Sequence, residues 1–596
     1  MEHEVDIGLS SITRRSGSSA SSPPRLKRYG RPSTIIVEDS IGLGHPSASL
    51  RSPSSPNLLK EFPPSATSPL TPRKLSRSNT LPRLQINHDD GLESLSMESS
   101  KVWRLRRWIH ALVLVNFDLE YGPKITKTFP HLTLTPSEAE NIAFSSFPDA
   151  PQIELGSQMH SFRVRPHDPD NDKLVRVDRD RPVVLDGYMY GYSYFTQRRD
   201  TTSKRGYQQS SLVILSPHPY PALFYTLLSY LGQSFLTHGG PMLEVACHNI
   251  ASWSDPNPGV TLELGFLGFV FNAELPSSAD TPQTGTVLSI TEYDQDVKIM
   301  ASIPPPHPPI INVFGACLQH MWSIWECLVL CEPILVYGTS AALTSQAVWW
   351  MRDILRPIPI TGDFRPFFTI HDTDYKEFVN SRPPQPGVVL GVTNPIIERT
   401  CKHWPHSISL GAVPKKERYP ATPKTPKTPW TPAESTMSAG PAPGWKSKTH
   451  KRYISRDRAL QKKIEDACKG NDRARIEASH ALRLHFSART TAFLAPLQRY
   501  LNTLIPTPSE AGIATSAPTS TPSVRTSPLS RLKPFNTSAF LASLSSSQAV
   551  STLPFKSSSK QREFYERWLR TRAFGVWLGM QEEVVSRVLR ERGCTV

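Results

Sequence analysis

The stretch PILVYGTSAALTSQAVWWMRDIL, residues 333–355, joins two patterns with different periods. Residues 334–337 are four consecutive apolar or aromatic residues between a proline and a glycine, which is typical of a short buried strand. Ser340 precedes a segment with helical periodicity, and a serine in that place caps the first turn of a helix. A buried strand followed directly by a helix is the repeating unit of a parallel sheet. The stretch therefore predicts an α/β domain.

The flanking segments repeat this alternation. FGACLQHMWSIWECLVL (314–330) is almost wholly apolar and predicts a helix that is buried on most faces. GVVLGVTNP (387–395) predicts another strand that ends in a turn, and IIERTCKHW (396–404) predicts another helix. Cys327 and Cys331 lie four residues apart in the first helix, where thiols are usually core residues. We therefore expect a central α/β unit over residues 309–412.

A second unit precedes this one, over residues 105–275. ALVLVNFDLEYGPKI (111–125) predicts a strand, a Gly-Pro turn and a second short strand. A helix is expected to begin at Pro136, and two further strands are expected in residues 186–200 and 208–216. Another helix follows from residue 221 and is expected to end at Gly232. A small sheet with helices is the simplest summary of this unit.

The rest of the chain is poor in apolar residues and rich in proline. Apolar residues make up 38% of the sequence and it holds 57 prolines, so part of it is not expected to pack. Leucines and aromatic residues at helical spacing in 472–505 predict a long amphipathic helix. The expected organisation is a disordered Ser/Pro/Arg-rich tail (1–100), a linker (276–308), a disordered basic Pro-rich linker (413–455), a helical part (456–505), a disordered insert (506–555) and a second helical part (556–596).

The chain is basic, with 67 Lys and Arg against 52 Asp and Glu, a net charge of +15. Residues 411–460 alone hold 11 Lys or Arg and 3 Asp or Glu. A solvated basic linker is the favoured interpretation, and weak attraction to acidic lipid head groups is the alternative. No basic platform with interleaved aromatic residues is present, so no nucleic-acid partner is expected. Scattered cysteines and short apolar runs predict a soluble, cytosolic protein without a signal peptide or a transmembrane segment.

Two low-complexity segments carry candidate phosphorylation sites. In RKLSRSNTLP (73–82), Thr80 follows Arg77 and precedes Pro82, a spacing that resembles the phosphorylated motif bound by 14-3-3 proteins. The repeat TPKTPKTPWTP suits proline-directed kinases. Its candidate threonines are Thr422, Thr425, Thr428 and Thr431.

The stretch DFRPFFTIHDTDYKEF (363–378) suggests chemistry, because it pairs His371 with Asp372 among further carboxylates. A metal site would need more ligands at supporting spacings, and Cys401, His403 and His406 meet this requirement no better. The sequence also lacks a phosphate-binding loop of the G-x-x-x-x-G-K-[ST] type, a G-x-S-x-G elbow and an H-E-x-x-H motif. We therefore expect no catalytic residue, no metal and no cofactor. Phe364, Phe367 and Phe368 are instead expected to anchor a core, with His371 and Asp372 as local hydrogen-bonding partners.

Six segments occur in the order of a known family: ALVLVNFDLEYGPKI, IAFSSFPD, YGYSYFTQRRDTTSKRGYQQSSLVIL, DFRPFFTIHDTDYKEF, GVVLGVTNP and HWPH. This order resembles the tripartite DENN module, and within it the DENN domain-containing protein 6 subfamily. The resemblance covers residues 105–412 and 472–505, and more weakly 560–580. It implies a longin-like N-terminal lobe, an α/β central lobe and a helical third lobe. The sequence departs from the family in its long N-terminal tail, in the linker after residue 412 and in an interrupted third lobe.

The resemblance further implies a guanine nucleotide exchange factor for a Rab-type GTPase at endosomal membranes, without covalent chemistry or a cofactor. The GTPase would lie across the cleft between the first two lobes. Two alternatives stay open: a non-catalytic Rab effector or trafficking scaffold, and a GTPase-activating protein with an arginine finger. The candidate interface residues lie in a basic loop and beside strand ends, where a solvated loop and internal ion pairs are the competing interpretations. They are Arg198, Arg199, Lys204, Arg205, Asp363, Arg365 and Asn394.

Overall fold

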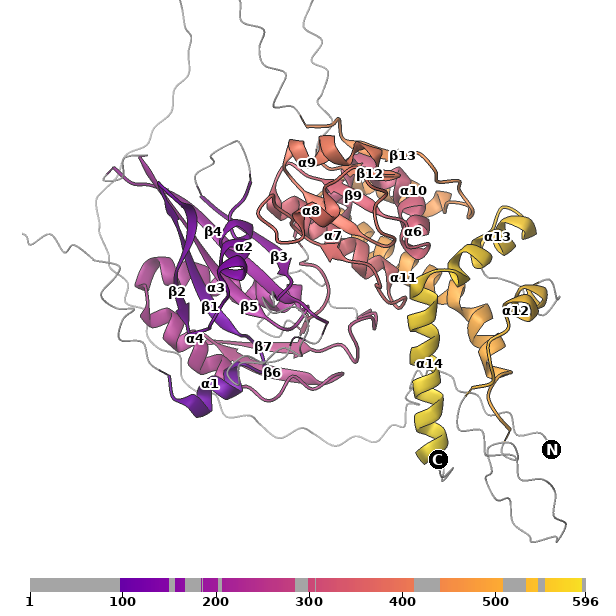
Figure 1. Cartoon of the computed structure of the whole chain (residues 1–596), viewed down its shortest axis with the longest axis horizontal. Coiled ribbons are helices and arrows are strands. Elements are labelled where there is room, and N and C mark those ends of the chain that lie inside the picture. The colour runs from indigo at the N-terminus through magenta and orange to yellow at the C-terminus, as the bar shows by residue number, and fades with distance from the viewer. Residues whose placement is uncertain are drawn as a thin grey trace, which may run out of the picture. The chain divides into compact units, whose positions relative to one another are not determined.

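The computed structural model describes residues 97–149, 156–166, 184, 186–201, 206–284, 298–305, 307–411, 440–507, 532–544 and 553–591 (Figure 1). All of them belong to the compact unit Gln85–Val596. Several predictions of the sequence fall outside the described residues: nearly all of the predicted tail, most of the basic linker, Lys204 and Arg205, Thr80 and the four Thr-Pro threonines.

The N-terminal lobe is built on a five-stranded antiparallel sheet with the strand order β2-β1-β5-β4-β3. The four predicted strands are confirmed, and β3 is an addition. The strands are β1 (Ala111–Asp118), β2 (Gly122–Phe129), β3 (Gly156–Val164), β4 (Met189–Arg199) and β5 (Tyr207–Ser216). The helices are α1 (Ser99–Leu105), α2 (Pro136–Ser145), α3 (Pro221–His238) and α4 (Pro241–Ser252).

Both faces of this sheet are covered by helices, because successive residues of a strand point to opposite sides. Val113 packs in one core with Ile142 of α2. Its neighbour Leu112 packs in another core with Leu223 and Leu227 of α3. Helix α2 begins at Pro136 as predicted, and Thr135 and Glu138 form a complete capping box at its start.

Helix α3 is longer than predicted. The sequence suggested an end at Gly232, but the helix continues to His238 and Gly239 follows it with a φ of 70°. Gly232 serves packing instead, because a Cβ there would lie 2.6 Å from the ring of Tyr194. A glycine inside a helix is thus explained by the close approach of a neighbouring strand.

A small second sheet joins the first lobe to the central one. Its strands are β6 (Thr261–Phe266), β7 (Phe269–Glu274) and β8 (Lys298–Met300), and β8 pairs in parallel with β7. Residues 276–308 were predicted to be a linker, and for residues 298–303 that prediction is wrong. Met300 and Ala301 are buried in the core together with α3, because β7 supplies backbone partners for this short apolar run.

The central lobe contains the predicted α/β sheet, with the strand order β10-β11-β9-β12-β13. The first four strands are parallel, and helix α7 (Ala341–Leu355) is capped by Ser340 as predicted. The strands are β9 (Ile334–Tyr337), β10 (Phe364–Arg365), β11 (Val389–Val392), β12 (His406–Ser409) and β13 (Gly444–Ser447). The helices are α5 (Ile310–Val313), η1 (Gly315–His320), α6 (Met321–Val329), α7, α8 (Tyr375–Phe378), α9 (Pro395–Thr400) and η2 (Cys401–His403).

The edge strand β13 corrects another prediction. Residues 413–455 were expected to be a disordered linker, but residues 444–447 pair antiparallel with β12. Tyr453 and Ile454 that follow are almost completely buried. This segment therefore folds although its average composition is polar, because its apolar side chains can be buried and the open sheet edge offers backbone hydrogen bonds.

The C-terminal part is helical, as predicted. The long helix α11 buries Leu482, Phe486, Phe493 and Leu497 on the expected face. The predicted insert 506–555 also contributes to the fold, because α12 lies within it and buries Phe540 and Leu541. The helices are α10 (Arg458–Lys469), α11 (Asp472–Asn502), α12 (Thr537–Ser543), α13 (Ser558–Leu569) and α14 (Arg572–Glu591).

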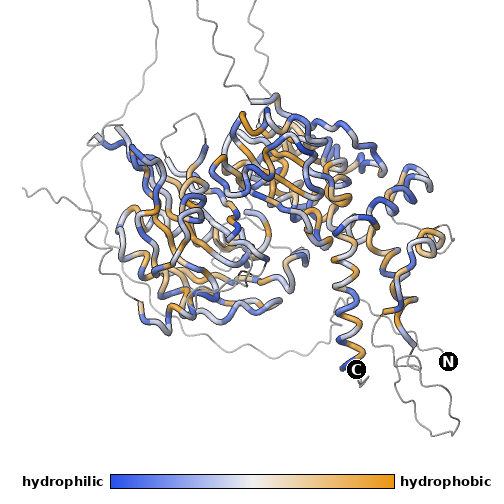
Figure 2. The backbone as a smooth tube through the Cα atoms, viewed as in Figure 1, coloured by the Kyte–Doolittle hydropathy of each residue, from blue (hydrophilic) through white to orange (hydrophobic). Residues whose placement is uncertain are grey.

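Figure 2 shows hydrophobic residues gathered in the interior of the central lobe and spread along α14. Among the described helices, none combines the length and the apolar character required to cross a bilayer. The structure is thus the mixed α/β fold with C-terminal helices that the sequence predicted.

Candidate functional site at the junction of the two lobes

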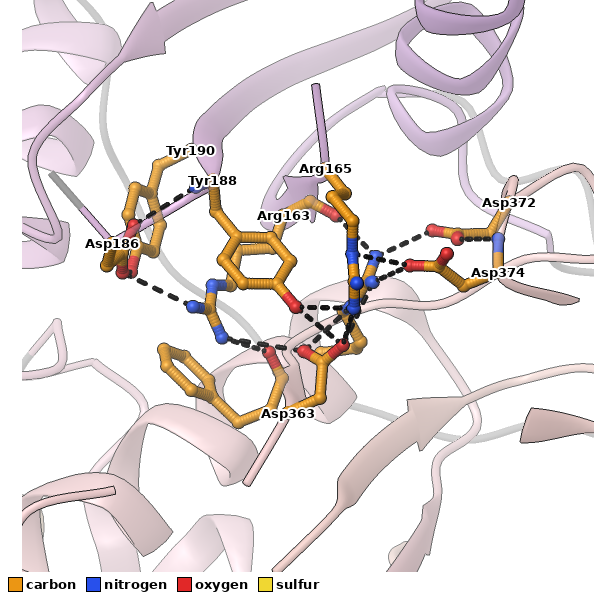
Figure 3. Close-up of polar contacts among 10 residues, drawn as sticks. Arg163, Arg165, Asp186, Tyr188, Tyr190, Asp363, Asp372 and Asp374 are labelled. Carbon is orange, nitrogen blue, oxygen red and sulfur yellow. Dashed lines mark hydrogen bonds and ion pairs between the residues drawn. The ribbon is translucent and has the colours of Figure 1, made fainter. Parts of the chain in front are cut away.

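The segment 363–378 folds around the side chain of Arg365, which is completely buried. The carboxylates of this segment, Asp363, Asp372 and Asp374, are shown in Figure 3. The guanidinium of Arg365 binds both oxygens of Asp363, with Nε–Oδ1 and Nη2–Oδ2 distances of 2.9 and 3.0 Å. Nη1 lies 3.1 Å from Oδ2 of Asp372, and Nη2 also contacts Asp374. The planar guanidinium thereby joins three carboxylates of one segment in a fixed geometry.

The N-terminal lobe completes this network from the end of β3 and the start of β4. Arg163 donates from Nη1 to the carbonyl oxygen of Phe364 at 2.9 Å. Arg165 lies 3.2 Å from both Asp363 and Asp374, and the hydroxyl of Tyr188 donates to Asp363 at 2.7 Å. Asp186 lies 3.2 Å from Nη2 of Arg163. The junction network is the set Arg163, Arg165, Asp186, Tyr188, Asp363, Arg365, Asp372 and Asp374.

The three arginines of the junction network offset most of the negative charge of its four aspartates. Burial opposes the charge on Asp363, but Arg365 outweighs it and lowers the pKa of this carboxyl. Burial likewise opposes the charge on Arg365, and Asp372 and Asp363 reverse the effect and raise its pKa. Burial and the nearby Asp363 raise the pKa of Tyr188 to about 12. Burial raises the pKa of Asp372, and the charge of Arg365 opposes this effect. Opposite charges at these distances form a stable cluster.

Aromatic stacking extends the junction beyond the ion pairs. The imidazole of His371 stacks on the ring of Phe144 in α2, with centroids 3.5 Å apart and planes inclined by 14°. Its Nδ1 lies 3.5 Å from Oε1 of Glu140 on the same helix. Thr393 adds a hydrogen bond of 3.3 Å to the carbonyl oxygen of Asp149. The two lobes are thus joined by side chains of both, along several elements.

Apolar side chains remain exposed around this contact. Tyr121 and Leu119, in the turn between β1 and β2, are 71% and 56% exposed, and Ile370, next to His371, is 44% exposed. The turn lies close to the stack, because a Cβ on Gly122 would be 3.4 Å from the ring of Phe144. We call Leu119, Tyr121 and Ile370 the junction patch. Large exposed apolar side chains on both sides of a contact between lobes are typical of a protein-binding surface.

Comparison with known proteins supplies the family. No family model matches the chain. The protein DENND6A of Mus musculus is 33% identical over 410 residues, which is 67% of this chain and 66% of the mouse protein. Human DENND6B is 32% identical over 414 residues, 68% of this chain and 69% of that protein. The chain belongs to the DENND6 family. The DENND6 homolog of Dictyostelium discoideum is 26% identical over 540 residues, 79% of this chain and 70% of that protein.

The predicted site residues of this DENND6-family chain do not form one cluster. Arg198 and Arg199 are exposed at the far end of β4 from Tyr188. At 3.3 Å per residue, roughly 30 Å separate them from the junction network. Asn394 caps α9 by accepting a hydrogen bond from the amide of Ile396. Asp363 and Arg365 are held in internal ion pairs, and the side chain of Arg365 is completely buried.

The interpretation of segment 363–378 as core is confirmed, since Phe364, Phe367 and Phe368 are each at most 4% exposed. Asp372 has the expected local partner, Arg365. His371 differs from expectation, because its partners lie on the other lobe. The sequence reasoning missed Arg163, Arg165 and Tyr188. Two arginines at alternate positions of a strand were the available signal, but nothing local identified their carboxylate partners about 200 residues away.

The histidines that were considered as metal ligands form hydrogen bonds or ion pairs within the protein. His403 bonds to the carbonyl oxygens of Thr400 and Arg382, and His406 lies 2.5 Å from Glu332. Glu332 in addition binds Arg567 of α13, so burial is outweighed and its pKa falls to about 2. Cys327, Glu332 and His450 place possible ligand atoms within 4.8 Å of one another. Because Glu332 is already paired with two cationic or hydrogen-bonding groups, we interpret this cluster as a polar contact between the central lobe and the helices.

Proposed function

We propose that this chain is a guanine nucleotide exchange factor that promotes GDP release from a Rab-type GTPase in vesicle trafficking. Membership of the DENND6 family and the resemblance to the DENN module support this function. The observation that carries the proposal is the junction patch, because it presents exposed apolar side chains beside the contact between two lobes. A partner seated there would touch both lobes at once.

The mechanism requires a binding surface and no covalent step. A GTPase holds its nucleotide through a phosphate-binding loop, magnesium and ordered switch loops. A protein that binds the nucleotide-free form more tightly than the GDP form weakens GDP binding by the same factor. A thousandfold effect needs roughly 4 kcal/mol of differential interaction, which a protein interface of ordinary size supplies.

The junction network has a supporting part in this proposal. It holds segment 363–378, and with it Ile370, in one position relative to α2 and the turn that carries Tyr121. Preorganised surfaces lose less conformational entropy on binding, so a fixed junction favours tight binding of one partner conformation. Asn394 at the start of α9 and the basic loop with Arg198, Arg199, Lys204 and Arg205 are proposed as further contacts. Asp363 and Arg365 contribute indirectly, because their side chains are largely buried and hold the segment 363–378 in place.

The test is release of fluorescent GDP from a panel of Rab GTPases. The full-length protein should accelerate release from at least one endosomal member. The double variant Tyr121→Ala/Ile370→Ala should slow that reaction at least tenfold. It truncates one aromatic and one aliphatic side chain, and a few such anchors carry most of the binding energy of an interface. The matched control is Val270→Ala/Val584→Ala, which removes exposed apolar side chains from β7 and α14.

Three outcomes would redirect the proposal. Lack of acceleration across the whole panel, with tight binding to a GTP-bound Rab, would favour an effector or scaffold. Faster GTP hydrolysis that is lost in Arg198→Ala or Arg199→Ala would favour a GTPase-activating protein. Equal activity of the junction-patch variant and its control would move the interface elsewhere.

We also propose that the N-terminal segment regulates this activity through phosphorylation. Thr80 would bind a 14-3-3 protein once phosphorylated, because the added phosphate would face an arginine cluster of that partner. Binding of purified 14-3-3 to the phosphorylated chain should disappear in Thr80→Ala. Persistence of binding in that variant would point to another site, including the Thr-Pro repeat.

A further inference from the structure

A basic surface covers the edge of the central lobe that is formed by β13 and the start of α10. Between residues 446 and 463 the chain holds eight Lys or Arg and one acidic residue, Asp457. We call these eight residues, with His320 of η1, the basic edge. The basic residues are Lys446, Lys448, Lys451, Arg452, Arg456, Arg458, Lys462 and Lys463.

Six of these eight side chains are exposed, and Arg452 and Arg456 are half-buried. Within the described residues, no ion pair joins any of the eight to a carboxylate. Asp457 is engaged elsewhere: its Oδ1 accepts from the amide of Leu460 at 2.9 Å, and Oδ2 lies 3.7 Å from Nδ1 of His485. The basic edge therefore differs from the salt-bridged surface of an ordinary helix, where opposite charges alternate.

The centre of the basic edge carries cations that face one another. The Nε atoms of Arg452 and Arg456 are buried and have no hydrogen-bond partner among the described residues. Burial lowers the pKa of Arg456, and the charge of Arg452 lowers it further. Burial also lowers the pKa of His320, and Arg456 and Arg452 add to the effect. Adjacent guanidinium groups without a carboxylate are an arrangement that binds phosphate oxygens, through the exposed parts of these half-buried side chains.

The basic edge and the junction patch lie at opposite ends of the central sheet. The strand order places β10, which precedes the exposed Ile370, at one end and β13 at the other. Strand β13 packs against η1, which carries His320, and α10 begins at Arg458 shortly after it. A partner on the basic edge would consequently leave the junction patch free.

We propose that the basic edge binds the anionic surface of a membrane, with lipid phosphates at Arg452 and Arg456 and the surrounding lysines in the diffuse negative field. A nucleic acid is disfavoured, because the aromatic residues of this segment are not available for stacking: Tyr453 is buried and Trp445 stacks on His406. The binding itself is independent of the proposed exchange function. Its consequence, an exchange factor oriented on the membrane of its GTPase, rests on that function.

The size of the effect follows from the field of an anionic membrane. Each basic residue close to such a surface strengthens binding by roughly fivefold at physiological salt. The attraction is screened within about one Debye length, which is about 8 Å at physiological ionic strength. Removal of three exposed lysines should therefore weaken binding by roughly 100-fold, and added salt should weaken the binding of the unmodified protein.

The experiment is sedimentation of the full-length protein with vesicles of phosphatidylcholine alone or with added phosphatidylserine and phosphoinositide. We expect binding to the anionic vesicles only, a large loss in Lys446→Gln/Lys451→Gln/Lys463→Gln, and no loss in the control Lys101→Gln/Arg104→Gln/Arg562→Gln. The control removes three exposed basic residues from α1 and α13, with the same change in net charge. Unfolding temperatures of both variants should match that of the unmodified protein.

Several results would overturn the proposal. These are equal binding to neutral vesicles, equal losses in the two variants, or tighter binding to single-stranded RNA than to anionic vesicles. A response to soluble inositol phosphate without vesicle binding would also overturn it. GDP release in solution, without vesicles, reports on the exchange function separately, so failure of one assay is distinguishable from failure of the other. If both hold, anionic vesicles that carry the GTPase should accelerate exchange by the unmodified protein but not by the lysine variant.

Discussion

The junction network and the basic edge place arginine in opposite circumstances. At the junction, Arg365 is completely buried and surrounded by Asp363, Asp372 and Asp374. At the basic edge, Arg452 and Arg456 are half-buried with no carboxylate partner among the described residues. A buried charge must be compensated within the fold, whereas a charge at the surface can remain available for another molecule. The difference separates residues that hold the structure together from residues available for binding.

The largest effect is expected from Arg365→Ala. This variant would leave three neighbouring carboxylates without their common partner, and breaking a buried ion pair in this way costs about 3–5 kcal/mol. Urea unfolding, followed by tryptophan fluorescence, should show this loss. The control Arg199→Ala removes an exposed arginine and should change stability by less than about 0.5 kcal/mol. Similar losses in both variants would contradict the contrast between the two regions.

A smaller effect, with a defined pH dependence, is expected from Glu332→Gln. The folded pKa of Glu332, about 2, lies below its value in an unfolded chain. Its stabilising contribution is thus fully present above the unfolded pKa, near 4.5, and is lost as the pH falls towards 2. Because Glu332 is partly exposed, we expect a loss of about 2 kcal/mol at pH 7. The unfolding difference between the two proteins should shrink below pH 4.5, and a difference independent of pH would refute this account.

His371→Ala tests the aromatic part of the junction. Loss of the stack on Phe144 should lower stability by about 1 kcal/mol, measured by thermal unfolding. The rate of GDP release per folded molecule should change less, since His371 serves the contact between lobes. Complete loss of exchange with an unchanged melting temperature would show that the imidazole has a direct function. Phe144→Leu, which keeps an apolar contact, is the companion variant.

The smallest effect is expected at the basic edge. Lys451→Gln/Lys463→Gln removes two exposed charges that have no acidic partner among the residues with a described position, so stability should change by less than about 0.5 kcal/mol. Reduced repulsion could even raise the melting temperature slightly at low salt. A clear loss of stability would mean that these lysines hold the fold, as Arg365 does.

The local sequence predicted most secondary structure but few of the long-range partners. Ser340 caps its helix and α2 begins at Pro136 as expected, because these signals require only neighbouring residues. Gly232 gave a wrong helix end, because the reason for a glycine there is the ring of Tyr194 on another strand. Strand β13 and helix α12 were missed because their segments are rich in polar residues and proline, while a few apolar residues decide their packing.

The sequence alone determined the α/β class, the order of the lobes and the family. Each of these depends on short-range periodicity or on motif order, and both can be read directly from the order of residues in the sequence. The tertiary structure decided that Arg163 meets Asp363 and that His371 stacks on Phe144 of the other lobe. It also decided that Arg452 and Arg456 lack acidic partners in the part of the chain that the structure describes. Charge pairing depends on distances in space. Folding brings together residues that are far apart in the sequence, and nothing in the neighbouring residues identifies their partners.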